Sequence, residues 1–127
     1  MPVSIHVEAD SGVAIGTCSG ILGLADAKDG ASKLWENPAW NGLAVVWDFR
    51  HGQLDTSSPE IVTLAKFIIE RQRSPAPARV AFVVARDVDY GQARIFEVFR
   101  EQPSTELHVF RDFDDALDWA RAAARPK

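Results

Sequence analysis

The sequence predicts one α/β domain with a mixed, mostly parallel sheet of four to five strands and helices packed on it. Segments with strand-like apolar patterns alternate along the chain with segments whose apolar residues recur at helical spacing, in the order β-β-α-β-α-β-α-β-α. Such alternation favours a parallel sheet with right-handed crossovers. A length of 127 residues suits one hydrophobic core and is too short for two, so 1–127 is expected to form a single domain.

An antiparallel hairpin is expected at the start of the chain. Val3, Ile5 and Val7 alternate with polar residues, a pattern typical of a strand with one buried face. A turn signal, Asp-Ser-Gly, follows at 10–12, and apolar residues return over 13–20 as a second strand.

The first helix is expected over 24–35. Its apolar residues recur at helical spacing, with charged residues on the other side: Leu24, Ala27, Ala31, Leu34 and Trp35. Pro and Gly in the segment 37–42 end this helix. The next segment, 43–49, is a nearly continuous apolar run, as in central strands covered on both faces.

The second half of the chain continues the alternation. Helices are expected over 59–73, 87–102 and 112–124, strands over 79–85 and 106–110, and a loop at 74–78. The inward-facing positions of the three helices are Ile61, Leu64, Ala65 and Ile68; Ile95, Phe96 and Phe99; and Phe113, Ala116, Leu117 and Ala120. Asp112 is the expected N-cap of the last helix.

Composition narrows the class of protein. The formal net charge of −4, without a basic block, argues against nucleic acid as a partner, because phosphate binding needs clustered Lys and Arg. Cys18 is the only cysteine, which excludes an internal disulfide and suits a reducing cytoplasm. The first residues do not resemble a signal peptide, and no apolar run approaches the roughly 18 residues of a membrane span. A cytoplasmic protein is therefore expected.

Motifs for catalysis, metals and nucleotides are missing from the sequence. It has no GxSxG, no GxxxxGK[ST] and no GxGxxG. The three histidines, His6, His51 and His108, are far apart and have no metal-ligand spacing. We therefore expect a non-enzymatic protein without a metal or cofactor.

Several stretches resemble one bacterial family. A hairpin is followed by a helix ending near "NPAW" and a strand ending in "VVWDFR"; later come "VAFVVA", "GQARIFE" and "VFRDFDDALDWA". In arrangement and in these phrases nearly the whole chain is similar to the STAS-like family, which is related to the anti-sigma-factor antagonists. The resemblance implies a single STAS-like domain that binds a partner protein and performs no chemistry.

The resemblance also implies a regulatory site. In the well-studied antagonists a partner kinase phosphorylates a Ser at the start of the second helix, after an Asp-Ser pair and before a Gly. The matching stretch is "DTSSP" at 55–59, so Ser58 takes that position, Ser57 is the second candidate, and Pro59 replaces the Gly. A simpler interpretation is helix capping: Ser57 forms a capping box with Glu60, or Ser58 is the cap and Pro59 the first helical residue.

Polar residues follow the two central strands, where ligands bind in open α/β sheets. Asp48 and Arg50 end one strand, and Tyr90 and Arg94 lie at the start of the helix after the next. Together with Arg86, these arginines would suit a small anionic metabolite or nucleotide near helix N-termini. The alternative is that these groups form ordinary ion pairs and caps.

Two tryptophans suggest a further alternative. Trp40 stands in a Pro/Gly loop, where an exposed position is expected, and with Trp35 it would line an apolar patch or pocket. STAS-like families show some kinship to lipid-binding CRAL-TRIO domains, which implies a lipid-like ligand. The leading hypothesis is a regulatory module that binds another protein through its second and third helices; a homodimer stays open. The residues assigned to binding are Asp48, Arg50, Tyr90 and Arg94, and those assigned to phosphorylation are Ser58 and Ser57.

Overall fold

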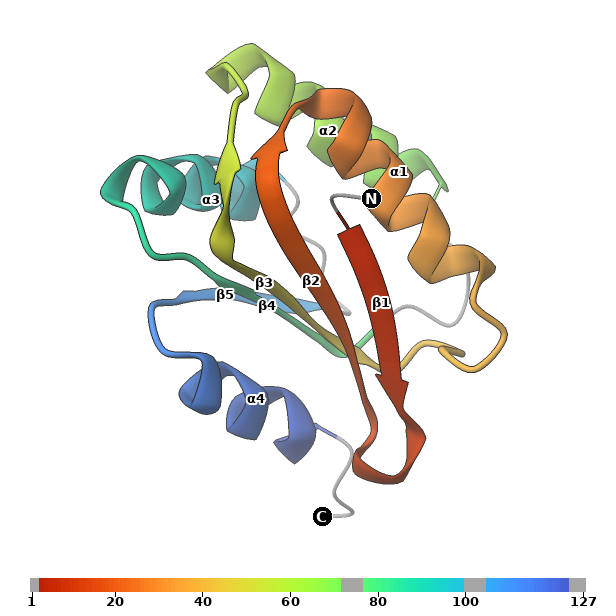
Figure 1. Cartoon of the computed structure of the whole chain (residues 1–127). Helices are drawn as coiled ribbons and strands as arrows, with labels where there is room; N and C mark the ends of the chain where they lie inside the picture. The colour runs from red at the N-terminus through yellow and green to blue at the C-terminus, as the bar shows by residue number, and fades with distance from the viewer. Residues whose placement is uncertain (1–2, 72–76, 100–104, 124–127) are drawn as a thin grey trace.

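A computed structural model of the chain describes residues 3–71, 77–99 and 105–123 (Figure 1). Its elements follow in the predicted order: β1 (Val3–Glu8), a short 3-10 turn (Ala9–Ser11), β2 (Val13–Leu22), α1 (Leu24–Glu36), β3 (Ala44–Leu54), α2 (Ser58–Arg71), β4 (Arg79–Val83), α3 (Asp87–Phe99), β5 (Glu106–Phe110) and α4 (Phe113–Ala122).

The strands form one five-stranded sheet in the order β1-β2-β3-β4-β5. β1 is antiparallel to β2, and the remaining neighbours are parallel. Figure 1 shows α1, α2 and α3 on one face of the sheet and α4 on the other. Each of the first three helices returns the chain to the next parallel strand on the same side. The predicted mixed, mostly parallel α/β fold is confirmed.

The core has two main layers because both faces of the central strands are covered. Val80, Phe82 and Val84 point toward α1, α2 and α3, whereas Ala81 and Val83 pack against α4. Each large apolar side chain that is fully buried in this way contributes about 1.5–3 kcal/mol relative to an exposed one. This two-sided burial explains why the strand reads as a continuous apolar run in the sequence.

β3 is longer than the sequence predicts. It continues past Phe49 to Leu54, and its last residues pair in parallel with the end of β2, from Ser19↔His51 to Leu22↔Leu54. This part of β3 is mostly polar and contains Gly52, so the apolar pattern stops too early. A Cβ on Gly52 would lie 2.8 Å from Leu22 Cδ1 and 3.1 Å from the Cys18 carbonyl oxygen, so the absence of a side chain at this position lets the two strands approach closely.

Trp40 is buried, not exposed as predicted. Only 5% of its surface is accessible, and its indole Nε1 donates a hydrogen bond to the Leu43 carbonyl at 2.9 Å. The loop turns back through Asn41 and Gly42, which both have positive φ (42° and 77°). The local sequence suggests a surface loop, but the satisfied indole N–H lets the ring enter the core.

An ion pair fastens the last helix to the first hairpin. Arg121 Nη2 donates to Glu8 Oε1 at 2.8 Å, and the Ser11 hydroxyl donates to the same oxygen at 2.9 Å. These hydrogen bonds lower the pKa of Glu8 below its ordinary value of 4.5. The contact therefore joins α4 to the hairpin of β1 and β2, which are far apart in the chain, and the ion pair requires the ionised carboxylate of Glu8.

This pair makes stability depend on pH in a defined direction. Because the folded-state pKa of Glu8 is lowered, its stabilisation is complete above the unfolded-state pKa and is lost as the pH falls through the folded-state value. Below pH 4.5 we expect the free energy of unfolding of Glu8→Gln, measured by urea titration, to fall less steeply with decreasing pH than that of the wild type. Parallel pH profiles for the two proteins would contradict this role of Glu8.

Some predictions fall outside the described residues. These are the end of the second helix at 72–73, most of the loop at 74–78, the end of the third helix toward 102, residue 124 of the last helix and the orientation of Phe99. Among the described helices, none is both long and apolar enough to cross a membrane.

Candidate functional site

Two exposed serines mark the junction between β3 and α2. The Glu60 amide donates to Ser57 Oγ at 3.3 Å, and the Ser57 amide donates to Glu60 Oε1 at 2.9 Å. This reciprocal pair is the predicted capping box, with Ser57 as the cap. Ser58 is the first residue of α2 and is exposed.

The start of α2 has little capacity left for an anion. Pro59 has no amide hydrogen, and the Glu60 amide already donates to Ser57. Of the first three helical residues, the Ser58 amide is therefore the one that remains for an external acceptor. A phosphate on Ser58 would gain from the helix dipole but would also lie near the Glu60 carboxylate.

The cap predicts different effects for the two serines. Ser57→Ala is expected to lower the free energy of unfolding by about 1 kcal/mol, because it leaves an amide of the first turn without its acceptor. Ser58→Ala is the matched control and should stay within about 0.5 kcal/mol of the wild type. Guanidinium titrations of both variants measure the difference. If Ser58→Ala lost more stability than Ser57→Ala, the assignment of Ser57 as the cap would be wrong.

A buried aspartate fastens this junction to α3. Asp89 is 0% exposed; its Oδ1 accepts from the Leu54 amide at 3.1 Å, and its two oxygens accept from the Arg86 guanidinium at 2.9 Å each. Beside it, Gln92 Nε2 donates to the Thr56 carbonyl at 2.9 Å. Side chains of α3 thus set the position of the segment that carries the serines.

Asp89 also closes an edge of the sheet. The last β3–β4 pair is Asp48 with Val83, so Leu54 lies beyond the reach of β4. The carboxylate supplies the acceptor that a longer β4 would otherwise offer to the Leu54 amide. The sequence does not reveal this role, because an Asp in a first helical turn is ordinary and the neighbouring Asp87 has a side chain that is 95% exposed.

Asp48 and Arg50 lie within β3 rather than after it. Arg50 Nε and Nη2 donate to the two Asp48 oxygens at 2.9 and 2.8 Å, and the guanidinium lies 4.4 Å from the Phe113 ring centroid of α4. Burial of Asp48 raises its pKa, but the hydrogen bonds from Arg50 outweigh burial and leave the pKa below its ordinary range. The two residues form the ion pair that one sequence interpretation expected.

Tyr90 and Arg94 lie on α3, across the sheet from that pair. The Arg111 guanidinium stacks 4.7 Å from the Tyr90 ring centroid, and its Nη2 contacts Asp87 Oδ1 at 2.7 Å. Arg94 Nη1 pairs with Glu97 Oε1 at 2.9 Å. The sheet therefore divides the four predicted binding residues between two faces.

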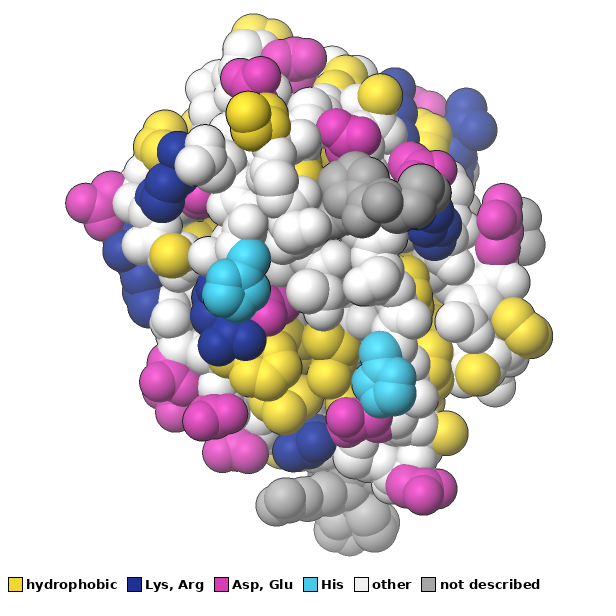
Figure 2. Space-filling view, in the orientation of Figure 1, with side chains coloured by type: hydrophobic (Ala, Val, Ile, Leu, Met, Phe, Trp, Pro, Cys, Tyr) yellow, Lys and Arg dark blue, Asp and Glu magenta, His cyan; other side chains and the backbone are white. Residues whose placement is uncertain are grey.

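The predicted anion site receives no support from this arrangement. Arg50, Arg86 and Arg94 each already hold a carboxylate. Arg50 also faces α4, while the other two belong to the α3 side. On the face drawn in Figure 2, acidic and basic side chains are interspersed around a hydrophobic area over α4 and the neighbouring strands. No group of three His, Cys, Asp or Glu within the described residues is arranged to hold a metal ion.

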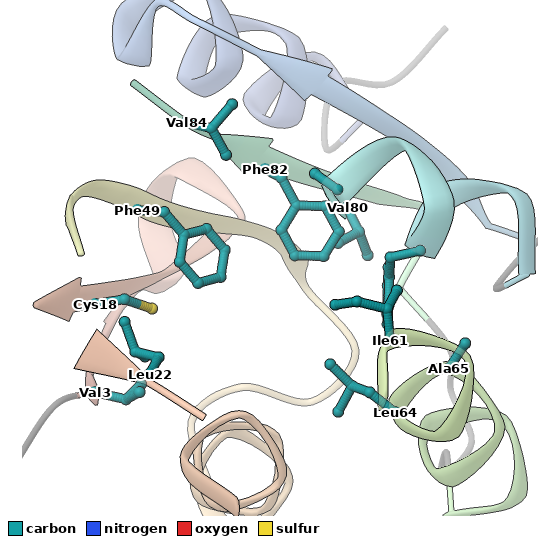
Figure 3. Close-up of a cluster of buried hydrophobic side chains, with 12 residues drawn as sticks. Val3, Cys18, Leu22, Phe49, Ile61, Leu64, Ala65, Val80, Phe82 and Val84 are labelled. Carbon is teal, nitrogen blue, oxygen red and sulfur yellow. The ribbon is translucent and has the colours of Figure 1, made fainter. Parts of the chain in front are cut away.

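An apolar cavity of about 80 Å³ lies between the sheet and the helices α1, α2 and α3. Figure 3 shows side chains from several elements turned toward this space, among them Cys18, Phe49, Leu64 and Phe82. On the side of α1 the wall includes three small residues: Ala27, Gly30 and Ala31. Trp35 and Trp40 line it too, so their predicted apolar pocket is interior, not a surface patch.

Cys18 in the cavity wall is expected to be inert. Its thiol is 1% exposed, and burial raises its pKa to about 12, with a further contribution from the charge of Asp48. At pH 8 a charged disulfide reagent should therefore label Cys18 no faster than the protein unfolds locally or globally. In urea, where the protein is unfolded, labelling should be complete. Immediate labelling of the folded protein would contradict the burial of this thiol.

The comparisons with known proteins bear on the fold. The chain is similar to the crystal structure of an uncharacterized protein of the DUF3478 family from Shewanella loihica PV-4, described as having a SpoIIAA-like fold. The TM-score is 0.61 at 20% identity, and the match covers 93% of this chain and 91% of that one. The chain has a SpoIIAA-like, that is STAS-like, fold. No protein-family model matches the chain, and no curated protein does.

The SpoIIAA-like fold confirms the arrangement that the sequence resemblance implied. In this fold Ser58 opens the helix between β3 and β4, the second of the four helices. A structural similarity at 20% identity supports the fold and does not assign a role to Ser58.

Proposed function

We propose that this chain is a non-enzymatic STAS-like regulatory module that binds another protein through the start of α2 and the first turns of α3. The observation that carries the proposal is the exposed serine pair fixed to α3 by Asp89 and Gln92. Next to Asp89 in the first turn of α3, Val88 is an apolar residue that is 56% exposed. A surface of polar and apolar groups that is already held in place suits a protein partner, because binding then loses less conformational entropy than binding to a mobile surface would.

Control by phosphorylation is part of this proposal, with Ser58 as the preferred acceptor and Ser57 as the second. The Ser57 hydroxyl serves the helix cap, whereas modification of Ser58 keeps that cap. A phosphate on Ser58 would add about two negative charges beside Glu60 and Asp55, which changes the electrostatics of the surface. We place the module in the cytoplasm, where the buried thiol of Cys18 stays reduced. A homodimer stays a prediction.

Pull-down from native lysate tests the proposal. We expect the wild type and Ser58→Ala to recover the same partner and Ser58→Asp to recover a different amount of it. Ser4→Asp, which adds the same charge on an exposed residue of β1, is the control and should behave as the wild type. If Ser58→Asp recovered as much partner as the wild type, control by phosphorylation would be contradicted. If no specific partner were recovered, the proposal of a protein-binding module would be contradicted.

A small apolar ligand is the second candidate function, favoured by the cavity between the sheet and the helices. Its volume of about 80 Å³ is below the roughly 300–1,000 Å³ of usual ligand pockets. It is about half that of an engineered apolar cavity of roughly 150 Å³ that binds benzene. A whole lipid does not fit this space, so a compact molecule is the ligand to consider.

A further inference from the structure

We infer that the cavity under α1 binds a compact nonpolar molecule that carries one carboxylate, with the carboxylate held at the seam between α1 and α2. This inference deepens the second candidate function and rests on it. It assigns a ligand class, an orientation and an entrance.

The interior selects a nonpolar body. Among the residues that the structure describes, no charged side chain lines the cavity, and the ionisable group in that part of the wall is the thiol of Cys18, a residue that is 1% exposed. Tryptophan and phenylalanine rings form much of the remaining wall, including Trp47 and Phe82. A buried charge without a partner would be costly there, so the part of the ligand inside the cavity must be uncharged.

The seam between α1 and α2 provides the entrance. Ala27 and Trp35 of α1 and Ile68 of α2 line the cavity and are at the same time only half-buried. The strand residues Trp47 and Leu107 also line the cavity and are half-buried, whereas Leu22 and Val80 are buried. The seam is assigned as the entrance because Trp35, on its α1 side, contacts Phe67 and the cations over that ring.

The rim of the seam selects a negative charge. Phe67 packs 5.9 Å from Trp35, and two cations lie over its ring: Lys28 Nζ at 5.1 Å and the Arg71 guanidinium at 4.7 Å. Neither cation forms an ion pair with a carboxylate among the described residues. A ligand whose nonpolar end enters beside Trp35 would place an acidic group within reach of both cations.

Matched ligands and variants test the inference with purified protein. The probes are butyrate and its neutral counterpart butan-1-ol, whose short nonpolar chains suit a cavity of about 80 Å³, and binding is followed by tryptophan fluorescence and by NMR. The acid is expected to bind the wild type saturably and about threefold or more tightly than the alcohol, as two partly exposed charge contacts allow. Lys28→Gln with Arg71→Gln should bring the two affinities together, whereas Lys66→Gln, which removes an exposed charge elsewhere on α2, should not.

Filling the cavity separates interior binding from surface binding. Ala31→Leu should abolish binding of both probes while circular dichroism stays as in the wild type, and Ala27→Leu serves if the first variant does not fold. Absence of saturable binding to the wild type, or unchanged binding in the filled variant, would overturn the inference. Equal affinities for acid and alcohol in the wild type would overturn the assignment of the carboxylate. None of these outcomes alters the pull-down result, so the protein-binding proposal stands or fails separately.

Discussion

Asp89→Ala is expected to lower the free energy of unfolding by about 1–3 kcal/mol, chiefly the cost of leaving the Leu54 amide without its acceptor, because the Arg86 side chain is 41% exposed and stays hydrated. The substitution removes the acceptor of the Leu54 amide and the partner of the Arg86 guanidinium in one step. A donor left without a partner in a buried position keeps its full desolvation cost. Urea or guanidinium unfolding of purified protein measures the difference.

Two further variants show which part of Asp89 matters. Asp87→Ala removes a carboxylate from the same helical turn whose side chain is 95% exposed, so its cost should stay within about 1 kcal/mol. Asp89→Asn retains an acceptor for Leu54 and loses the charge, and should fall between the two. If Asp89→Ala were no more destabilising than Asp87→Ala, the junction would not depend on this carboxylate.

Gly16→Ala is expected to destabilise the protein by about 1–3 kcal/mol through overpacking. A Cβ at Gly16 would lie 2.3 Å from Cε3 of the Trp47 ring, which packs directly on the β2 backbone. The bulky ring must move, and because it also lines the cavity, its fluorescence should change along with the stability.

The control for this prediction has the opposite sign. Gly91 lies in α3 with nothing within 4 Å of an added Cβ, so Gly91→Ala should stabilise the protein by about 0.5–1 kcal/mol through helix propensity. Unfolding titrations of both variants compare them directly. A stabilising Gly16→Ala would mean that Trp47 does not rest on the glycine.

Local patterns were sufficient for the elements of the fold. The alternation of Val3, Ile5 and Val7 identifies β1, and continuous apolar runs identify the central strands that helices cover on both faces. The caps were equally legible: Ser57 with Glu60 at α2, and Asp112, whose carboxylate accepts from the Asp115 amide at 3.0 Å. These features depend on residues within a few positions of each other, so the sequence alone contains them.

The parts of the site that were not predicted depend on residues distant in the chain. The extension of β3 becomes a strand because β2 pairs with it, although its own residues are mostly polar. Asp89 matters because its carboxylate meets the amide of Leu54, and nothing in the sequence around either residue points to the other. Trp40 enters the core because it packs against residues of other elements, among them Ala14 of β2 and Leu34 of α1, while its indole N–H is satisfied by the nearby Leu43 carbonyl.

The amino-acid sequence by itself determined the order of strands and helices, the α/β class and the serine cap of α2, because periodicity and capping are short-range. Only the tertiary structure decided which residues share a surface. It placed Asp48 and Arg50 on the α4 face and Tyr90 and Arg94 on the α3 side, and it left the cavity beneath the small residues of α1. The physical reason is that the face a residue occupies, and the volume left between layers, follow from how whole elements pack.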